Sequence, residues 1–185
     1  MSKGKRIERH KALAIAAELR ERLTNANTSI IVGGSIRRGK ATVGDIDLVA
    51  VCGNQKATDT LNDTLGELFG YCKKKPQRAK RFGSWLAYVE MNGNSYYQDV
   101  GINVFDCNPQ EVGAALLFCT GSGTFNIKMR SIAKRRGLLL NRYGLFNRDD
   151  VRENVCPATD EESIFSALRI PFFQPVQRTE CALAW

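Results

Sequence analysis

Hydrophobic and polar positions recur along the chain with two different periods, and these periods predict where helices and strands form. Over residues 5–24 apolar side chains return every three or four positions, which is typical of an amphipathic helix. Two short β-branched runs that end in glycine, 28–34 and 45–53, predict strands, and the second is apolar enough to be central in a sheet. Helical spacing returns over 57–70, although a glycine lies within it.

Shorter segments follow in the second half of the chain. Residues 84–107 predict a β-hairpin, because Asn92-Gly93 is a strong signal for a tight turn between two strands. Helices are expected over 109–119 and 122–136, and from Gly137 onward the segments are short and separated by turns. The pattern as a whole predicts an α+β protein with a main domain and a small C-terminal α/β subdomain.

Length and composition fit this organisation. The 185 residues suit one compact domain, or a main domain with a small one appended. Hydrophobic residues make up 43% of the chain, which is enough for a buried core. No run of about 18 apolar residues occurs, and charges recur through the first helix, so we expect neither a membrane span nor a signal peptide. We therefore expect an intracellular, cytoplasmic protein that acts as a monomer and has no membrane partner.

Charge narrows the class of partner. The formal net charge is +8 and the sequence pI is about 9.3. A basic protein of this kind favours a polyanionic partner, because each contact with a phosphate releases counterions. Nucleic acid is the first candidate.

The number and spacing of the cysteine and histidine residues argue against two kinds of functional site. None of the six cysteines forms a C-x-x-C pair, so a zinc site is not expected, and without a secretion signal we expect reduced thiols. The only histidine, His10, lies in the basic N-terminal helix and is expected at the surface. A His-rich metal site and a Ser-His-Asp triad are therefore not expected.

The segment after the first strand contains the clearest candidate chemistry. Gly33 and Gly34 allow positive φ and a close approach of the backbone to a ligand, and Ser35, Arg37 and Arg38 follow. A turn with free N–H groups and fixed cations suits a phosphate chain.

Two aspartates begin the next strand. Alternate residues of a strand face the same side, so Asp45 and Asp47 project together. Two carboxylates at such a short distance repel each other, and a bound divalent cation relieves the repulsion. Oxygen ligands of this type suit Mg²⁺ or Mn²⁺.

The spacing of these residues resembles that of the family X DNA polymerases within the nucleotidyltransferase superfamily. Their pattern is G-S-x-R-R-G-x-x-x-x-G-D-x-D. It is matched in this chain by Gly34, Ser35, Arg37, Arg38, Gly39, Gly44, Asp45 and Asp47. The match is specific, because other members of the superfamily usually keep only the G-S and the D-x-D.

A second block resembles the junction between palm and thumb in the same polymerases. Thr120-Gly121-Ser122 is similar to their T-G-S turn, and Phe125, Asn126 and Arg130 are similar to their F-N-x-x-x-R. Asn126 and Arg130 are one helical turn apart and reach the same face. The closing segment also resembles the family. The resemblance implies a nucleotidyltransferase palm over 1–118, with a mixed β-sheet and helices, and a thumb over 119–185.

The resemblance also implies a function: addition of deoxynucleotides to a primer 3′-end, at short gaps in DNA repair. Its partners would be gapped or primer–template DNA and a deoxynucleoside triphosphate, and its cofactor two Mg²⁺ ions, for which Mn²⁺ can substitute. The implied catalytic and metal-binding positions are Asp45, Asp47 and residue 103. The implied nucleotide-binding residues are Gly34, Ser35, Arg38, Gly44, Phe118, Cys119, Gly121 and Asn126.

DNA contacts are expected from basic residues. The run KKKPQRAKR and the thumb helix contribute Lys73, Lys74, Lys75, Arg78, Lys80, Arg81, Lys128, Arg130 and Lys134. The chain starts almost directly at the palm, as in minimal viral members of the family, so we expect no sugar-phosphate lyase activity.

Asn103 is the main departure from the family. Counting back from the T-G-S turn, the third catalytic aspartate falls at this asparagine, which cannot usefully accept a proton. Asp106 has the wrong parity for the same face, and Asp99 lies about 13 Å along the strand. Three explanations follow: an introduced inactivating change, a naturally impaired protein, or a different register with Asp99 or Asp106 as third ligand. We favour the first, because the other site residues match the family.

Smaller departures concern substrate choice and closure. Phe118-Cys119 stands where the family usually has Tyr-Phe, which predicts weaker exclusion of ribonucleotides. Arg142 stands where a relative has glutamate. Two alternatives stay open besides the polymerase: a template-independent or RNA-directed nucleotidyltransferase, and a non-catalytic protein that binds gapped DNA.

Overall fold

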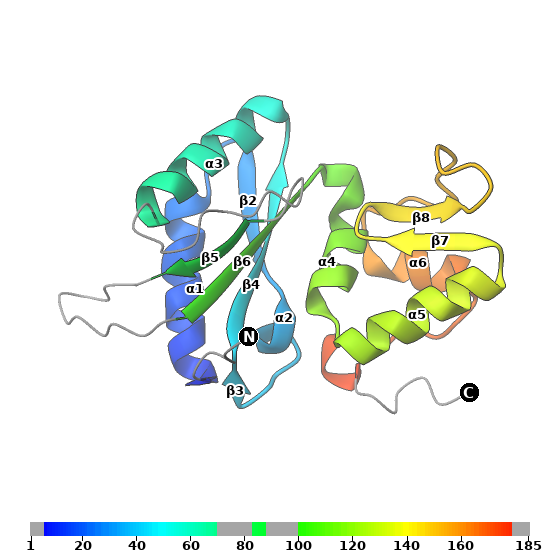
Figure 1. The fold of residues 1–185 in the computed structure, drawn as a ribbon, viewed down its shortest axis with the longest axis horizontal. Helices are drawn as coiled ribbons and strands as arrows, with labels where there is room; N and C mark the ends of the chain where they lie inside the picture. Colours follow the sequence, from blue (N-terminus) through cyan, green and yellow to red (C-terminus); the bar gives the residue numbers. More distant parts are fainter. Residues whose placement is uncertain (1–5, 70–82, 88–99, 179–185) are drawn as a thin grey trace. The chain divides into compact units, whose positions relative to one another are not determined.

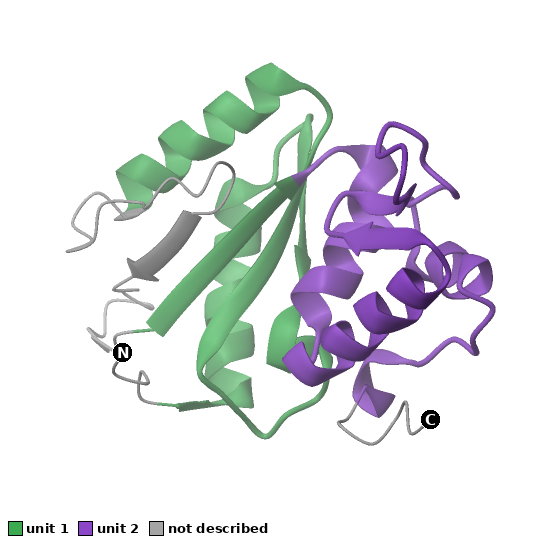
Figure 2. Cartoon of the chain, turned by 45° about the vertical axis from the view of Figure 1, so that its right-hand side comes forward, with its two compact units in different colours: residues 1–106 green, residues 107–185 purple. Residues whose placement is uncertain are grey.

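The computed structural model describes residues 6–69, 83–87 and 100–178. The chain forms two compact units, Met1–Asp106 and Cys107–Trp185 (Figure 2). The family resemblance predicts a boundary after residue 118, whereas the two units of the structure meet before the helix that contains this residue.

Unit 1 combines helices with a four-stranded sheet (Figure 1). Its elements are β1 (Ile7–Glu8), α1 (Arg9–Leu23), β2 (Thr28–Val32), α2 (Gly34–Arg37), β3 (Thr42–Val43), β4 (Asp45–Cys52), α3 (Gln55–Phe69), β5 (Gly83–Ala87) and β6 (Val100–Cys107). The strand order is β2-β4-β6-β5, so β4 and β6 are the central strands. The pair β1–β3 forms a separate two-stranded sheet.

Strand pairing follows the sequence pattern. β2 runs antiparallel to β4, and β5 runs antiparallel to β6, as a hairpin over 84–107 requires. The predicted turn at Asn92-Gly93 lies outside the described residues. The structure adds α2, a one-turn helix where sequence analysis expected only a turn.

Alternation along the central strands separates the core from the opposite face of the sheet. The even-numbered apolar side chains of β4 and β6 join one hydrophobic cluster, to which α1 and α3 contribute. This cluster contains Ile46, Leu48, Ala50 and Cys52 of β4 and Val100, Ile102 and Val104 of β6. The odd-numbered residues of these strands therefore face the other side of the sheet.

In the described part of unit 2, three α-helices and a short hairpin pack around one hydrophobic core. Its elements are η1 (Pro109–Glu111), α4 (Val112–Thr120), α5 (Gly123–Arg135), β7 (Leu138–Asn141), β8 (Gly144–Asn147), α6 (Glu161–Ala167) and η2 (Pro175–Gln177). α4 packs against α6 and α5 against β7, around a core that includes Phe125, Met129 and Phe165. The two helices expected here are present, although the first begins with a 3₁₀ turn.

The expectations for His10 and for the described cysteines are met. His10 is exposed, and the described cysteines Cys52, Cys107, Cys119 and Cys156 are free thiols. Among the helices of the described residues, none is long and apolar enough to cross a membrane.

Candidate active site

Two central strands bring three side chains of the site together. Asp45 and Asp47 are odd-numbered residues of β4, and Asn103 is an odd-numbered residue of the adjacent β6, so all three lie on the face opposite the core. Nδ2 of Asn103 donates hydrogen bonds to Oδ2 of Asp45 at 3.2 Å and to Oδ1 of Asp47 at 2.9 Å. The strands therefore place position 103 beside the two carboxylates.

Asp106 does not share this position. Asp106 lies on the same side of the sheet as Cys52. Burial raises the pKa of the Cys52 thiol, and the negative charge of the nearby Asp106 carboxylate raises this pKa further. Cys52 belongs to the core face, opposite the aspartate pair. The register that would make Asp106 the third ligand is thus not the one the structure adopts, and Asp99 lies outside the described residues.

The bend between β2 and α2 closes over Asp47. The Gly33 N–H donates to the backbone oxygen of Asp47 at 2.8 Å. Gly34 has φ +60, and a β-carbon there would lie 2.1 Å from Oδ2 of Asp47. Only glycine fits this approach without a shift. On β6, a β-carbon at Gly101 would lie 3.5 Å from Cβ of Asp45, an ordinary van der Waals distance, so the packing of Asp45 does not require glycine there.

Ser35 and Arg38 lie next to this bend. The Ser35 hydroxyl oxygen is buried and, within the described part of the chain, has no hydrogen-bond partner. A buried, unsatisfied hydroxyl is costly and is suited to a ligand. Arg38 ends α2 and is close enough to Asp47 to favour its charged form.

Asp47 has the most perturbed carboxyl of this site. Burial raises its pKa to about 6, and the neighbouring Asp45 adds to the rise. The hydrogen bond from Asn103 and the charge of Arg38 act in the opposite direction. Burial and repulsion between acids are the conditions that a bound cation relieves.

The donor set fits a hard divalent cation only in part. The oxygens of Asp45 and Asp47 are the ligands that Mg²⁺ prefers. Asn103 turns its donor nitrogen toward the carboxylates, and an amide nitrogen is not a metal ligand. Among the described residues, no group of three or more His, Cys, Asp or Glu forms a metal-binding cluster.

In unit 2, the residues of the second block cluster at the start of α5. Ser122 caps α5 by accepting a hydrogen bond from the Phe125 N–H at 3.3 Å. Asn126 is nearly buried, and its Nδ2 donates to the Phe118 carbonyl oxygen at 2.7 Å. A small pocket is lined by Ala114, Leu117, Phe118, Asn126, Arg130, Leu140 and Asn141. Cys119 and Gly121 are buried nearby in the chain, whereas Gly44 belongs to unit 1.

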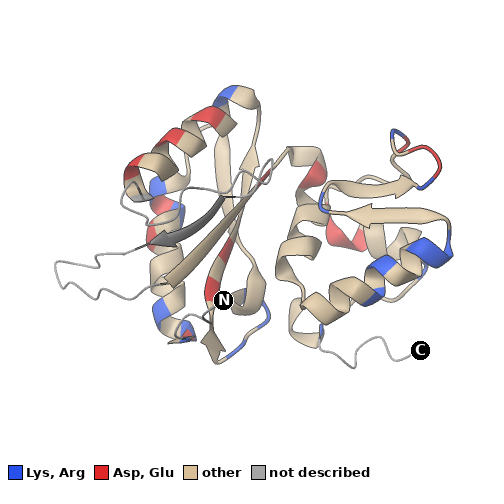
Figure 3. Cartoon of the chain, viewed as in Figure 1, with Lys and Arg blue, Asp and Glu red and all other residues tan. Residues whose placement is uncertain are grey.

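Some of the basic residues expected to contact DNA lie within the described part of the chain, and others lie outside it. Lys128, Arg130 and Lys134 lie on α5, where basic residues gather (Figure 3). Lys73, Lys74, Lys75, Arg78, Lys80 and Arg81 lie outside the described residues. Arg142 is buried in unit 2, with its guanidinium on the Tyr143 ring and hydroxyl.

Two contacts were not anticipated from the sequence. The Phe118 carbonyl that orients Asn126 is a backbone group and has no sequence signature. Gly101 could have been noticed, because it lies two positions before Asn103 on the same face of a predicted strand, where it contacts Asp45 at an ordinary van der Waals distance.

A mixed sheet with paired aspartates, preceded by a glycine bend and followed by a small helical unit, defines the class: a nucleotidyltransferase with palm and thumb. Models of two polymerase domain families match the chain and agree with this class. Residues 6–97 match the DNA polymerase beta palm and residues 115–179 the DNA polymerase beta thumb. The chain belongs to the family X DNA polymerases.

Relatives and solved structures extend the comparison. DNA polymerase lambda of Rattus norvegicus is 27% identical over 83% of this chain, which spans 29% of that protein. Repair DNA polymerase X of African swine fever virus is 27% identical over 95% of this chain and 96% of its own length. Leishmania infantum polymerase beta in a ternary primer–template complex shares the fold. Its TM-score is 0.81 at 22% identity, covering 95% of this chain and 77% of that chain.

Proposed function

We propose that this chain is a DNA-directed polymerase that adds a deoxynucleotide to a primer 3′-end, at short gaps in DNA repair. The observation that carries the proposal is the pair Asp45 and Asp47 on one face of β4, closed over by the Gly34 bend. Support comes from relatives named as repair and lambda polymerases, and from a neighbour solved as a ternary gap complex.

The reaction follows from these groups. The primer 3′-hydroxyl gives its proton to water and its oxygen attacks the α-phosphorus of the triphosphate; the bond from that phosphorus to the bridging oxygen breaks, and pyrophosphate leaves with its electron pair. Asp45 and Asp47 would hold Mg²⁺, or Mn²⁺; the two-metal arrangement of the family would need a third carboxylate at position 103, where this chain has asparagine. Bound there, the cations would neutralise the triphosphate and acidify the primer hydroxyl.

Binding of the triphosphate is assigned to the bend. The unsatisfied Ser35 hydroxyl and the Arg38 guanidinium supply a donor and a cation, with backbone support at Gly34 and Gly44. Phe118, Cys119 and Gly121 would lie at the sugar, and Asn126 and Arg130 at the nascent base pair. Basic residues of α5 would contact the DNA backbone.

Asn103 would slow the chemistry. Its amide cannot take the proton from the primer hydroxyl, and its nitrogen rather than its oxygen faces the carboxylates. We therefore expect slow transfer by the chain as it stands.

The test is single-turnover filling of a one-nucleotide DNA gap by the chain and by the Asn103→Asp variant, with Mg²⁺ and with Mn²⁺. The variant should be faster by at least about tenfold, equivalent to ~1.4 kcal/mol of barrier. A smaller gain would refute the assignment of position 103. Extension that occurs only in the presence of a template supports a DNA-directed polymerase. Equal extension with and without a template supports a template-independent enzyme.

A second candidate is a non-catalytic protein that binds gapped DNA. The two hydrogen bonds from Asn103 favour it, because they satisfy the carboxylates without a cation. It predicts tight binding of gapped DNA and no extension even by the Asn103→Asp variant.

A further inference from the structure

The side chain of Asn103 acts as an internal link between two carboxylates. Its Nδ2 has two hydrogens, and each has an acceptor: Oδ2 of Asp45 and Oδ1 of Asp47. The reverse orientation would point the amide oxygen at two carboxylate oxygens, with no hydrogen between them. The partners therefore fix which end of the amide faces the pair.

The backbone holds this link in place. β6 lies between β4 and β5 in the sheet, and the neighbours of Asn103 on β6, Ile102 and Val104, are buried in the core at 0% and 5% exposure. Only the side-chain torsions of Asn103 are free to change. Turning the amide oxygen toward a cation would break both hydrogen bonds to the carboxylates.

The net charge of the side chains at this site also indicates how many cations it can hold. The two carboxylates are neutralised by one divalent cation, whereas an aspartate at 103 would leave one negative charge and attract a second cation. No further carboxylate, histidine or cysteine completes a cluster in the described part of the chain.

We propose that this chain holds a single divalent cation, the one that accompanies the nucleoside triphosphate, because the Asn103 amide takes the place of the second. The inference rests on the proposed function and narrows it. The chain forms a stable complex with nucleotide and gapped DNA in which the primer hydroxyl is not activated.

Manganese electron paramagnetic resonance tests the number of ions. Complexes are formed with one-nucleotide-gapped DNA, an intact primer hydroxyl, Mn²⁺ and a non-hydrolysable α,β-substituted deoxynucleoside triphosphate. The chain should give the hyperfine spectrum of an isolated Mn²⁺ ion, and the Asn103→Asp variant the spectrum of an exchange-coupled pair. A coupled pair in the unaltered chain, or an isolated ion in the variant, overturns the inference.

The outcomes separate the inference from the function on which it rests. If neither protein binds the Mn²⁺–nucleotide complex, the proposed function fails. If both bind it with the same spectrum, the function stands and the role of Asn103 fails. Asn108→Asp is the charge-matched control: Asn108 is exposed, and its backbone N–H, which aspartate retains, donates to the Glu111 side chain at 3.0 Å. This control should give the spectrum of the unaltered chain.

Melting in EDTA gives an independent measure. Replacing the amide by a carboxylate exchanges two hydrogen bonds for repulsion, so Asn103→Asp should melt below the unaltered chain and below Asn108→Asp. Added Mn²⁺ should raise the melting temperature of Asn103→Asp more than that of the other two proteins. Equal melting temperatures of the three proteins in EDTA would contradict the hydrogen-bonded link between Asn103 and the two carboxylates.

Discussion

Gly34 approaches Asp47 so closely that a β-carbon on Gly34 would lie 2.1 Å from Oδ2 of the carboxylate. Gly34 also has φ +60, a conformation in which a side chain is strained. Gly34→Ala should therefore lower the free energy of unfolding by more than about 2 kcal/mol, because strain and the displacement of Asp47 add. Urea denaturation measures the change.

Gly66→Ala is the matched control. Gly66 lies within α3, and a β-carbon there would meet nothing within 4 Å. Alanine should stabilise this helix by about 0.5 to 1 kcal/mol. If Gly34→Ala were as harmless as Gly66→Ala, the close packing of the bend on Asp47 would be wrong.

The raised pKa of Asp47 predicts a pH dependence of stability. Its pKa is about 6 in the folded chain and 3.8 as the ordinary value, so the folded state binds the proton more tightly. Stability from this group is greatest below pH 3.8, falls as the pH rises from 3.8 to 6, and is constant above. The total loss is at most about 3 kcal/mol.

Urea denaturation in EDTA, compared between the chain and Asp47→Asn, isolates this effect. The stability of Asp47→Asn relative to the chain should rise between pH 4 and pH 7. Asp63→Asn, which removes the same charge from an exposed position of α3, controls for net charge. A constant difference between the chain and Asp47→Asn would show that burial does not perturb this carboxyl.

The sequence predicted the aspartate pair for a reason that the structure makes clear. Period-two alternation depends only on local backbone geometry, so Asp45 and Asp47 had to share a face once β4 formed. Placing Asn103 beside them required the order of strands in the sheet, which came from resemblance rather than from any local pattern.

Other parts of the site were not predictable, for physical reasons. A helix as short as α2 is too brief to show a periodic pattern. The contact from Asn126 to Phe118 uses a backbone carbonyl that every residue has. The ion pair between Glu161 and Arg178 joins residues far apart in sequence, and neither carries a local signal of burial.

Basic side chains on α5 predict that DNA binding depends steeply on salt. Each phosphate contact contributes about 0.9 to the slope of log affinity against log salt concentration. The double variant Lys134→Ala and Arg135→Ala, two exposed residues at the end of α5, should lower that slope by up to about 2. Fluorescence anisotropy with gapped DNA at several salt concentrations measures it.

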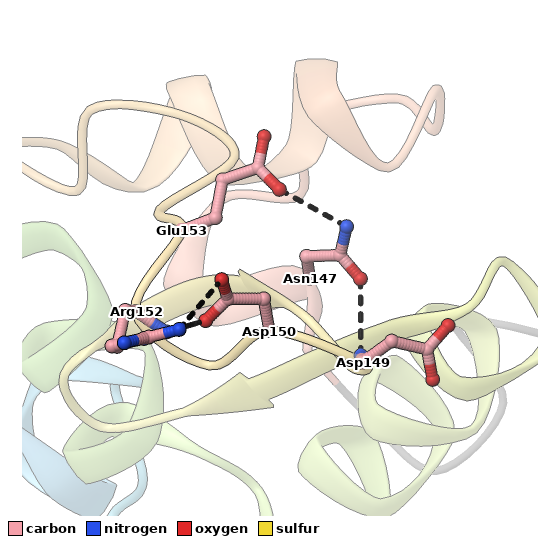
Figure 4. A network of polar contacts seen from close by, with 5 residues as sticks. All are labelled: Asn147, Asp149, Asp150, Arg152 and Glu153. Carbon is pink, nitrogen blue, oxygen red and sulfur yellow. Dashed lines mark hydrogen bonds and ion pairs between the residues drawn. The ribbon is translucent and has the colours of Figure 1, made fainter.

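Arg152→Ala is the control for the loss of a cation. Arg152 is exposed and paired with Asp150 at 3.1 Å in the loop after β8, where Asn147 also binds Glu153 (Figure 4). Because its charge is already offset by a neighbour, its removal should leave the slope unchanged. An equal fall in slope for both proteins would mean that α5 has no special role in the grip on DNA.

A buried ion pair in unit 2 joins the start of α6 to Arg178. The side chains of Arg178 and Glu161 are 0% and 5% exposed, and the Arg178 guanidinium lies 5.5 Å from the centre of the Phe165 ring. Arg178→Met would remove the cation that pairs with the buried Glu161 carboxylate and should cost about 3 to 5 kcal/mol. Adding Glu161→Gln should recover much of this loss, because the buried negative charge is then gone.

A double-mutant cycle measured by urea denaturation gives the coupling between the two side chains. It should be several times the coupling of the exposed pair Arg152 and Asp150, which water screens. The aromatic rings around Arg178 exclude water, so neither partner can recover its hydration when the other is removed. Additive single and double variants would mean that the carboxylate and the guanidinium reach water independently, and that the pair does not hold the end of the described chain against α6.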